Sequence, residues 1–253
     1  MSNEKTFAVV IPARYESSRF PGKPLVDICG KPMIQHVWER SCLAVDKENV
    51  YVATDDARIQ SAVEAFGGQV VMTSSGCLTG TDRLAEANLT LNCDFIVNVQ
   101  GDEPLINPDD INIVIKAFLK SGNVTNAMCA ITSEQEFRSF TVPKVTFSQS
   151  GKLLYMSRAG IPQTKTSEYK FGYKQVCIYA FSKEQLAFFY SNKVKTCFEQ
   201  VEDIEILRFL ESDYVVDMVE IEAGSLAVDT PEDLVNVRQS KQLQKKNRDF
   251  HVK

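Results

Sequence analysis

Three cationic side chains follow the first strand-like segment of the chain and are its clearest candidates for chemistry. The β-branched run Val9–Ile11 predicts a buried strand that breaks at Pro12, and Arg14, Arg19 and Lys23 lie in the loop that follows. Arginine offers a planar fork to phosphate oxygens and lysine a compact charge, so this mixture suits a polyphosphate. An ordinary solvated surface loop is the alternative. The Gly-x-x-x-x-Gly-Lys-Ser/Thr spacing is absent, which disfavours a Walker-type NTPase.

A second group of polar side chains is expected at the end of a later strand. An apolar segment that begins near Phe95 runs into Gln100, Asp102 and Glu103, which places an amide and two carboxylates at its carboxyl end. Ligands of open α/β sheets collect outside the carboxyl ends of the strands. Asp102 is therefore well placed to hold Mg²⁺, which takes oxygen ligands and is commonly shared with substrate phosphates. The alternative is that Asp102 only caps a turn.

A helix that opens with glycine is the third candidate. Gly80 permits a close backbone approach, and the free N–H groups of the helix start can line a ligand site. The alternative is an ordinary helix start with Thr81 as the N-cap.

These candidates lie on a predicted parallel sheet. Strands over 50–54 and 69–72 alternate with a helix over 57–66, capped by the Asp55-Asp56 pair, and an earlier helix over 31–40 should have Pro32 in its first turn. The β-α-β-α-β order predicts a three-layer, doubly wound, mostly parallel α/β fold. The length of 253 residues is compatible with one domain over 1–253.

The pattern changes in the second half of the chain. From about 125 to 215, shorter strand-like pieces (127–131, 144–147, 152–156 and 175–181) predict an inserted antiparallel section that roofs the site or forms a subunit contact. A helix over 198–211 should present Glu199, Glu202 and Glu205 on one solvated face. A short strand over 226–228 should lead, through a Thr230/Asp233 capping box, into the C-terminal helix.

Composition narrows the class of protein. The net charge of −5 argues against a general nucleic-acid binder, so any cationic site must be local. Seven cysteines without a C-x-x-C pair indicate reduced core residues of a cytoplasmic protein, and two distant histidines disfavour a His-based zinc site. Neither a signal peptide nor an apolar run long enough for membrane insertion is expected.

Several motifs in one order carry a family resemblance. They are Ile11–Tyr15, Arg19–Leu25, Gly30–Ile34, Val52–Asp55, Gly80–Arg83, Asn98–Pro104, Ser157–Ala159 and Val228–Leu234. Together they closely resemble the 3-deoxy-manno-octulosonate (Kdo) cytidylyltransferases, or CMP-Kdo synthetases, over nearly the whole chain. The resemblance implies a nucleotide-diphospho-sugar transferase fold, which is Rossmann-like, and a homodimer. It also implies transfer of CMP from CTP to an acidic keto-sugar, with Mg²⁺ and release of pyrophosphate, for lipopolysaccharide or capsule synthesis.

The resemblance also implies roles for individual residues. Arg14 and Lys23 should be catalytic, together with Asp102 and Asp229 as the two magnesium ligands. The nucleotide should contact Pro12, Ala13, Arg14, Arg19, Lys23, Gly80, Thr81 and Arg83. The sugar should contact Gln100, Arg158, Gln175, Tyr179, Glu202 and Glu205. Charge that builds on the phosphates can be met by these cations, so no histidine base is required.

The departures from the family lie where the sugar should sit. Gln175 stands where the family usually has histidine, Ile206 where its Glu-Gln-Leu-Arg motif has glutamine, and Ser225-Leu226-Ala227 where it has Gly-Thr-Gly. These departures leave three hypotheses. The first is CTP-dependent transfer to Kdo. A paralogue that activates another acidic sugar or small acid is the second, and a catalytically silent nucleotide-binding protein is the third.

Overall fold

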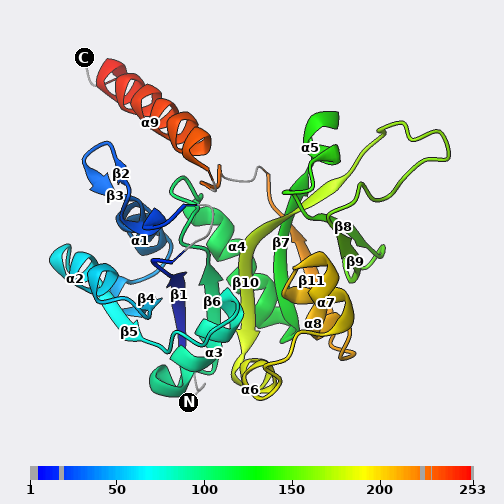
Figure 1. Ribbon diagram of the computed structural model, residues 1–253, viewed down its shortest axis with the longest axis horizontal. Helices are drawn as coiled ribbons and strands as arrows, with labels where there is room; N and C mark the ends of the chain where they lie inside the picture. Colours follow the sequence, from blue (N-terminus) through cyan, green and yellow to red (C-terminus); the bar gives the residue numbers. More distant parts are fainter. Residues whose placement is uncertain (1–4, 17–19, 223–225, 229, 252–253) are drawn as a thin grey trace.

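A single nine-stranded sheet runs through the computed structural model, which describes residues 5–16, 20–222, 226–228 and 230–251, with side chains as far as residue 241 (Figure 1). Its strands are β1 (Phe7–Ala13), β4 (Val50–Thr54), β5 (Gln69–Met72), β6 (Phe95–Val99), β7 (Val124–Ala130), β8 (Lys144–Phe147), β9 (Leu153–Ser157), β10 (Tyr173–Ser182) and β11 (Val216–Glu220). The main order is β11-β7-β10-β6-β1-β4-β5.

Strand direction follows the predicted pattern. β6, β1, β4 and β5 are parallel neighbours, and β11 is parallel to β7. β10 runs antiparallel between β6 and β7, and β8 and β9 extend this antiparallel part. The mostly parallel sheet with a small antiparallel section is thus confirmed.

Helices cover both faces of the sheet. They are α1 (Met33–Ala44), α2 (Ala57–Ala65), α3 (Gly80–Leu91), α4 (Pro108–Ser121), α5 (Glu134–Arg138), α6 (Lys183–Ser191), α7 (Cys197–Glu202), α8 (Ile206–Leu210) and α9 (Pro231–His251). One core cluster joins the sheet to α3, α6 and α8, and a second joins it to α1, α2 and α4. Because each face buries its own apolar layer, the fold has the three layers predicted from the sequence.

The C-terminal helix α9 packs on a small core of its own. It lies beside α1 and the hairpin of β2 (Asp27–Ile28) and β3 (Lys31–Pro32) (Figure 1). Ile28 and Met33 meet Val228, Leu234 and Val237 there, and all five are buried. This contact ties the end of the chain to its beginning.

His36 and Lys241 add two polar contacts to the same region, and these contacts are here called the latch. The Nε2 atom of His36 donates to the carbonyl of Ile28 at 2.7 Å, because a carbonyl can only accept. Nδ1 of the neutral ring then accepts from the Lys241 ammonium. Burial lowers the pKa of His36 below its usual value, and the charge of Lys241 adds to this shift.

Two predictions about helices are wrong. Pro32 is the N-cap of α1 and belongs to β3, where it pairs with Asp27 of β2. The helix therefore begins at Met33 rather than earlier. The helix expected over 198–211 is two short helices, α7 and α8, because Asp203 adopts the left-handed conformation (φ 52°) and ends α7. Consequently Glu199, Glu202 and Glu205 do not form one solvated face.

The strand expected over 226–228 is wrong, because these described residues belong to no strand. Instead the backbone N–H of Val228 donates to the carbonyl of Asp102 at 2.9 Å. The capping box is confirmed, since the Thr230 N–H donates to Asp233 Oδ2 at 2.8 Å and the Asp233 N–H donates back to Thr230 Oγ1 at 3.3 Å.

All seven cysteines are free, but the expectation that they are core residues is wrong for the exposed Cys29 and Cys197, and only Cys129 is buried. No described helix is long and apolar enough to cross a bilayer.

Candidate active site

Two adjoining pockets open at the carboxyl ends of β1 and β6. The first, here the nucleotide pocket, is lined by Pro12, Ala13, Arg14, Lys23, Pro24, Cys77, Leu78, Thr79, Gly80, Arg83, Gln100, Gly101 and Asp102. It therefore collects the predicted nucleotide-binding residues except Thr81, which is buried beneath it, and Arg19, which lies outside the described residues.

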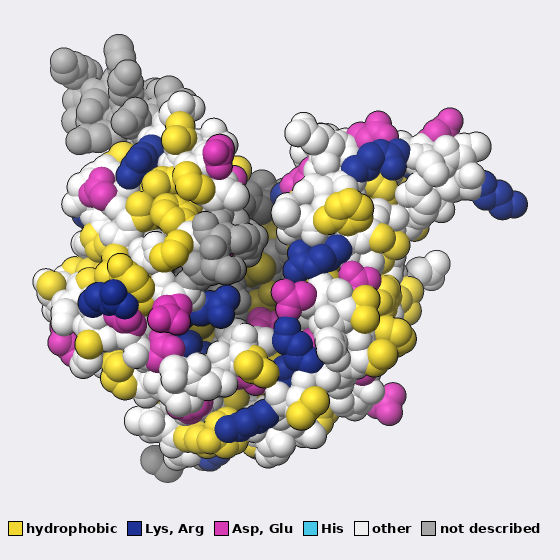
Figure 2. All heavy atoms as spheres, viewed as in Figure 1, with side chains coloured by type: hydrophobic (Ala, Val, Ile, Leu, Met, Phe, Trp, Pro, Cys, Tyr) yellow, Lys and Arg dark blue, Asp and Glu magenta, His cyan; other side chains and the backbone are white. Residues whose placement is uncertain are grey.

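The second pocket lies against the antiparallel part of the sheet. This acceptor pocket is lined by Arg14, Leu78, Thr79, Gly80, Gln100, Asp102, Phe140, Thr141, Pro143, Arg158, Gln175, Cys177, Tyr179, Lys195, Glu199, Asp203, Ile204 and Glu205. Six residues belong to both pockets, so the two spaces meet there, and Arg14, Gln100 and Asp102 carry the longer polar side chains among them; the other three are Leu78, Thr79 and Gly80. Figure 2 shows the hollow between the two parts of the molecule, with Lys and Arg side chains on both sides.

Lys23 and Asp102 bring the two predicted groups into contact. Lys23 Nζ lies 2.8 Å from Asp102 Oδ2, and both side chains are mostly covered. A Cβ atom at Gly101 would lie 2.8 Å from the carbonyl oxygen of Pro12, so only glycine permits this approach of the turn after β6 to β1. Arg14 is exposed at the junction, and among the described residues it has no hydrogen-bond or ion-pair partner.

The start of α3 forms another wall of the nucleotide pocket. Thr79, not Thr81, is the N-cap, and it forms a capping box with Asp82. The Ser/Thr-x-x-Asp spacing of these two residues was a signal that could have revealed the cap. A Cβ atom at Gly80 would lie 2.9 Å from Gln100 Nε2, so a larger residue here would require the flexible end of Gln100 to move. Arg83 is buried against the pocket and pairs with Asp55 at 3.2 Å.

Strand β10 supplies the floor of the acceptor pocket. A bulge between Val176 and Tyr179 breaks its register with β7, and Asn126 Nδ2 donates to the carbonyl of Val176 at 2.9 Å. Gln175 Nε2 donates to Asn126 Oδ1 at 3.1 Å, which orients the amide that replaces the family's histidine. Tyr179 is 2% exposed, and burial raises its pKa well above the usual value.

Arg158 and Glu202 hold the wall of the acceptor pocket opposite β10 by hydrogen bonds. Arg158 donates to the carbonyls of Phe140, Glu202 and Asp203, and the last of these bonds measures 3.0 Å. Glu202 accepts from the Ser157 hydroxyl at 2.6 Å and from the Arg158 backbone N–H at 2.8 Å. Glu202 is not among the described residues that line either pocket, so it supports Arg158 from behind.

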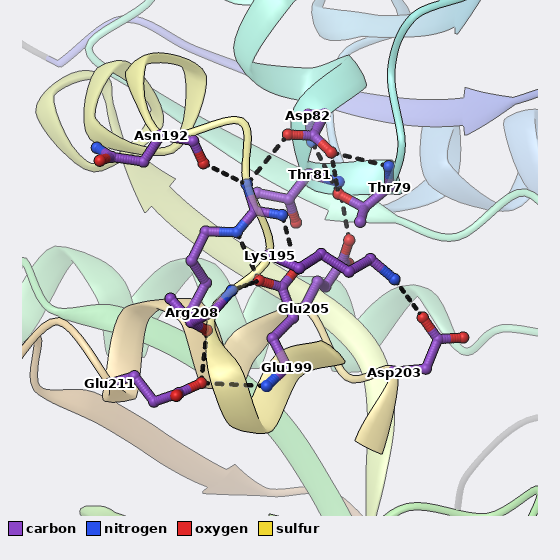
Figure 3. Close-up of polar contacts among 11 residues, drawn as sticks. Thr79, Thr81, Asp82, Asn192, Lys195, Glu199, Asp203, Glu205, Arg208 and Glu211 are labelled. Carbon is purple, nitrogen blue, oxygen red and sulfur yellow. Dashed lines mark hydrogen bonds and ion pairs between the residues drawn. The ribbon is translucent and has the colours of Figure 1, made fainter. Parts of the chain in front are cut away.

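A buried ionic network joins the two pockets (Figure 3). Arg208 is fully buried and pairs in bidentate fashion with Glu199, at 2.7 and 2.6 Å. The same guanidinium lies 3.3 Å from Asp82, in the capping box of α3. Glu205 accepts the backbone N–H of Thr81 at 3.1 Å, and burial raises the pKa of Glu205.

Ile206 does not fit its expected place beside the sugar. The side chain is fully buried in the core cluster with α3 and α6, and it lines neither pocket. Because α8 begins anew after the break at Asp203, Ile206 points into the core. The residues that the sequence reasoning missed are Lys195, Asp203, Thr79 and Arg208.

The comparisons with known proteins agree with this geometry. A family model described as cytidylyltransferase matches residues 8–221. The chain belongs to the cytidylyltransferase family.

The names of the relatives of this cytidylyltransferase specify two sugar acids. This chain is 42% identical over 243 residues to the 3-deoxy-manno-octulosonate cytidylyltransferase of Syntrophotalea carbinolica, covering 92% of this chain and 97% of the relative. It is 43% identical over 233 residues to the 8-amino-3,8-dideoxy-manno-octulosonate cytidylyltransferase of Shewanella loihica, covering 89% and 94%. A CMP:2-keto-3-deoxy-manno-octonic acid synthetase complexed with CTP matches in structure with a TM-score of 0.88 and 39% identity, covering 94% of this chain and 99% of the other.

The donor set of this cytidylyltransferase suits a hard cation at the junction. Asp102 offers carboxylate oxygens, and Mg²⁺ typically uses one or two carboxylates together with substrate phosphates. The second candidate, Asp229, lies outside the described residues, but its neighbour Val228 is hydrogen-bonded to Asp102. Among the described residues no group of three His, Cys, Asp or Glu side chains is arranged to hold a metal.

Proposed function

We propose that this cytidylyltransferase transfers CMP from CTP to the anomeric hydroxyl of Kdo, or of a closely related ulosonic acid, and releases pyrophosphate. The observation that carries the proposal is the meeting of the two pockets at Arg14, Gln100 and Asp102. A nucleotide in one pocket and a sugar acid in the other would place a hydroxyl next to the α-phosphate. The names of the relatives and the CTP complex of the similar structure support this choice of substrates.

The chemistry follows from the cations at the junction. The anomeric hydroxyl attacks the α-phosphorus, the bond from that phosphorus to the bridging oxygen breaks, and pyrophosphate leaves with the electron pair. Negative charge grows on the phosphate oxygens, where Arg14 and Lys23 can stabilise it. Lys23 is held by Asp102 at 2.8 Å, so its ammonium is in place before the nucleotide binds. Arg83 and the backbone at Gly80 are expected to orient the base.

Magnesium is proposed as the cofactor, held by Asp102 and Asp229. When bound, it would neutralise phosphate charge and lower the pKa of the attacking hydroxyl. Neither pocket is lined by a described histidine, and His36 is engaged in the latch to α9. In this proposal the hydroxyl proton passes to solvent or to a phosphate oxygen.

Pyrophosphate release tests the proposal directly. Enzyme, Mg²⁺ and CTP are incubated with Kdo, with the 8-amino analogue, or with no acceptor, and ATP and UTP serve as nucleotide controls. We expect pyrophosphate to be released only when both CTP and a sugar acid are present. Lys23→Met should lose most turnover, whereas Lys31→Met, at an exposed pair with Glu39 outside both pockets, should not. CTP binding by calorimetry without turnover on either acid would favour the silent nucleotide-binding protein.

We also propose a homodimer. Leu154, Phe198 and Val201 expose large apolar side chains on β9 and α7, and exposed apolar groups of this kind are typical of association surfaces. Light scattering after size-exclusion chromatography should give twice the chain mass of 28.4 kDa, and a monomer would overturn the proposal. A cytoplasmic location and a place in lipopolysaccharide or capsule synthesis complete the proposal, and loss of the CMP-sugar in cells lacking the protein would support the latter.

A further inference from the structure

Lys195 and Asp203 form an ion pair on the wall of the acceptor pocket. Lys195 Nζ lies 2.5 Å from Asp203 Oδ1, and Figure 3 shows the lysine side chain extended toward the carboxylate. Both residues line the acceptor pocket and neither lines the nucleotide pocket. The pair therefore lies on the acceptor side of the junction, within reach of the charge of Arg14.

The backbone around the pair is fixed while its charged groups stay accessible. Asp203 is held in the left-handed conformation, its N–H donates to the carbonyl of Glu199 at 2.8 Å, and its carbonyl accepts from Arg158 at 3.0 Å. Yet 71% of the Asp203 side chain is exposed, against 28% of the Lys195 side chain. In the described part of the chain, neither Asp203 Oδ2 nor the Lys195 ammonium makes another hydrogen bond, so both have capacity for a ligand.

More positive than unpaired negative charge acts near the Lys195–Asp203 pair. The hydrogen bond from Lys195 lowers the pKa of Asp203, and the charges of Arg158 and Arg14 act in the same direction. One cation, Lys195, thus contacts the exposed carboxylate, and the charges of two others act on it. The carboxylate of Glu199 is matched by Arg208, and Glu205 is engaged by Thr81. A hydroxyl can donate to Asp203 and accept from Lys195, whereas an ammonium would be repelled by the three cations.

We propose that Lys195 and Asp203 are specificity-determining residues that bind the end of the acceptor farthest from its anomeric carbon and select a terminal hydroxyl over a terminal amine. The inference rests on the proposed function, because the anomeric hydroxyl must lie at the junction. The opposite end of the carbon chain then extends toward the wall that carries the pair. Asp203 attracts an amine and Lys195 repels it, so the two residues act in opposite directions on the same choice.

Acceptor competition tests the inference. The ratio of kcat/KM for Kdo to that for its 8-amino analogue is measured for the wild type, Lys195→Met and Asp203→Asn, with CTP saturating. Wild type should prefer Kdo. Lys195→Met should move the ratio toward the amine by about tenfold, because Asp203 loses its ammonium partner, and Asp203→Asn should move it further toward Kdo. The KM for CTP should stay unchanged in both variants.

Lys193→Met is the matched control. Lys193 lies over the ring of Tyr190 at 4.4 Å and lines a different pocket, so its loss should leave the ratio unchanged. The inference would be overturned if Lys195→Met and Asp203→Asn shifted the kcat/KM ratio in the same direction. It would also be overturned if neither variant shifted the ratio while the wild type was active. In both cases the proposed function would stand. A wild-type enzyme that uses neither acid would overturn the proposed function and the inference with it.

Discussion

Replacing Arg208 by methionine should destabilise the protein severely. The guanidinium makes two short bonds to Glu199, a third contact to Asp82 and a bond of 3.0 Å to the carbonyl of Asn192. It also stacks on Phe189, with 3.7 Å between the guanidinium carbon and the ring centre. The variant therefore leaves Glu199, whose side chain is 1% exposed, as a buried charge without its partner.

The expected loss is about 3–5 kcal/mol, which is the usual cost of removing one partner from a buried ion pair. That amount is a large share of the roughly 5–15 kcal/mol that stabilises a typical folded protein. Urea unfolding followed by circular dichroism measures it. The double variant Arg208→Met/Glu199→Leu removes both charges, so it should regain most of the lost stability.

The double variant also tests the link between the pockets. Arg208 connects Asp82, next to the nucleotide wall, with Glu199 in the acceptor wall, so the folded double variant should show higher KM values for both substrates. A loss below about 1 kcal/mol for Arg208→Met would refute the reasoning. So would a double variant that is less stable than the single one.

Three further outcomes are expected. Asp102→Asn and Asp229→Asn should each stay folded and lose about a hundredfold or more in turnover, and near-normal rates across a magnesium titration would contradict the metal assignment. Gln175→His should raise activity on Kdo, measured as kcat/KM, because the amide stands where the family has histidine. His36 has a lowered pKa when folded, so the unfolded chain takes up a proton first and stability should fall as pH drops below about 6.5. His36→Gln should flatten this decline between pH 7.5 and 5.5 in urea unfolding, and an unchanged decline would argue against the latch.

Much of the sheet could be predicted because its signals are local. The apolar runs before Pro12 and Gln100 are buried strands, and polar residues follow them where the chain leaves the core. Arg14, Lys23 and Asp102 could be brought together by the rule that strand ends in a parallel sheet share one edge. The structure places all three at the nucleotide pocket, and their catalytic roles remain predictions.

The rest of the site depends on contacts between distant segments. Arg208 and Asp82 are 126 positions apart, and no periodicity in either helix indicates that they pair. The break at Asp203 carries no glycine or proline, so the acidic residues from 199 to 205 were expected on one continuous helix. Strand β11 and helix α4 were missed as well, and β11 is held by its pairing with β7, a partner remote in sequence.

The docking of the C-terminal segment has a consequence for protein synthesis. Val228 and α9 leave the ribosome after all nine strands of the sheet and the residues that line both pockets have been made. Until then Ile28 and Met33 lack the cover of Val228, Leu234 and Val237, and Asp102 lacks its bond from Val228. A nascent or prematurely terminated chain would therefore hold both substrate pockets without the segment that carries Asp229. On the proposed role of Asp229 as a magnesium ligand, chains that lack this segment would not consume CTP.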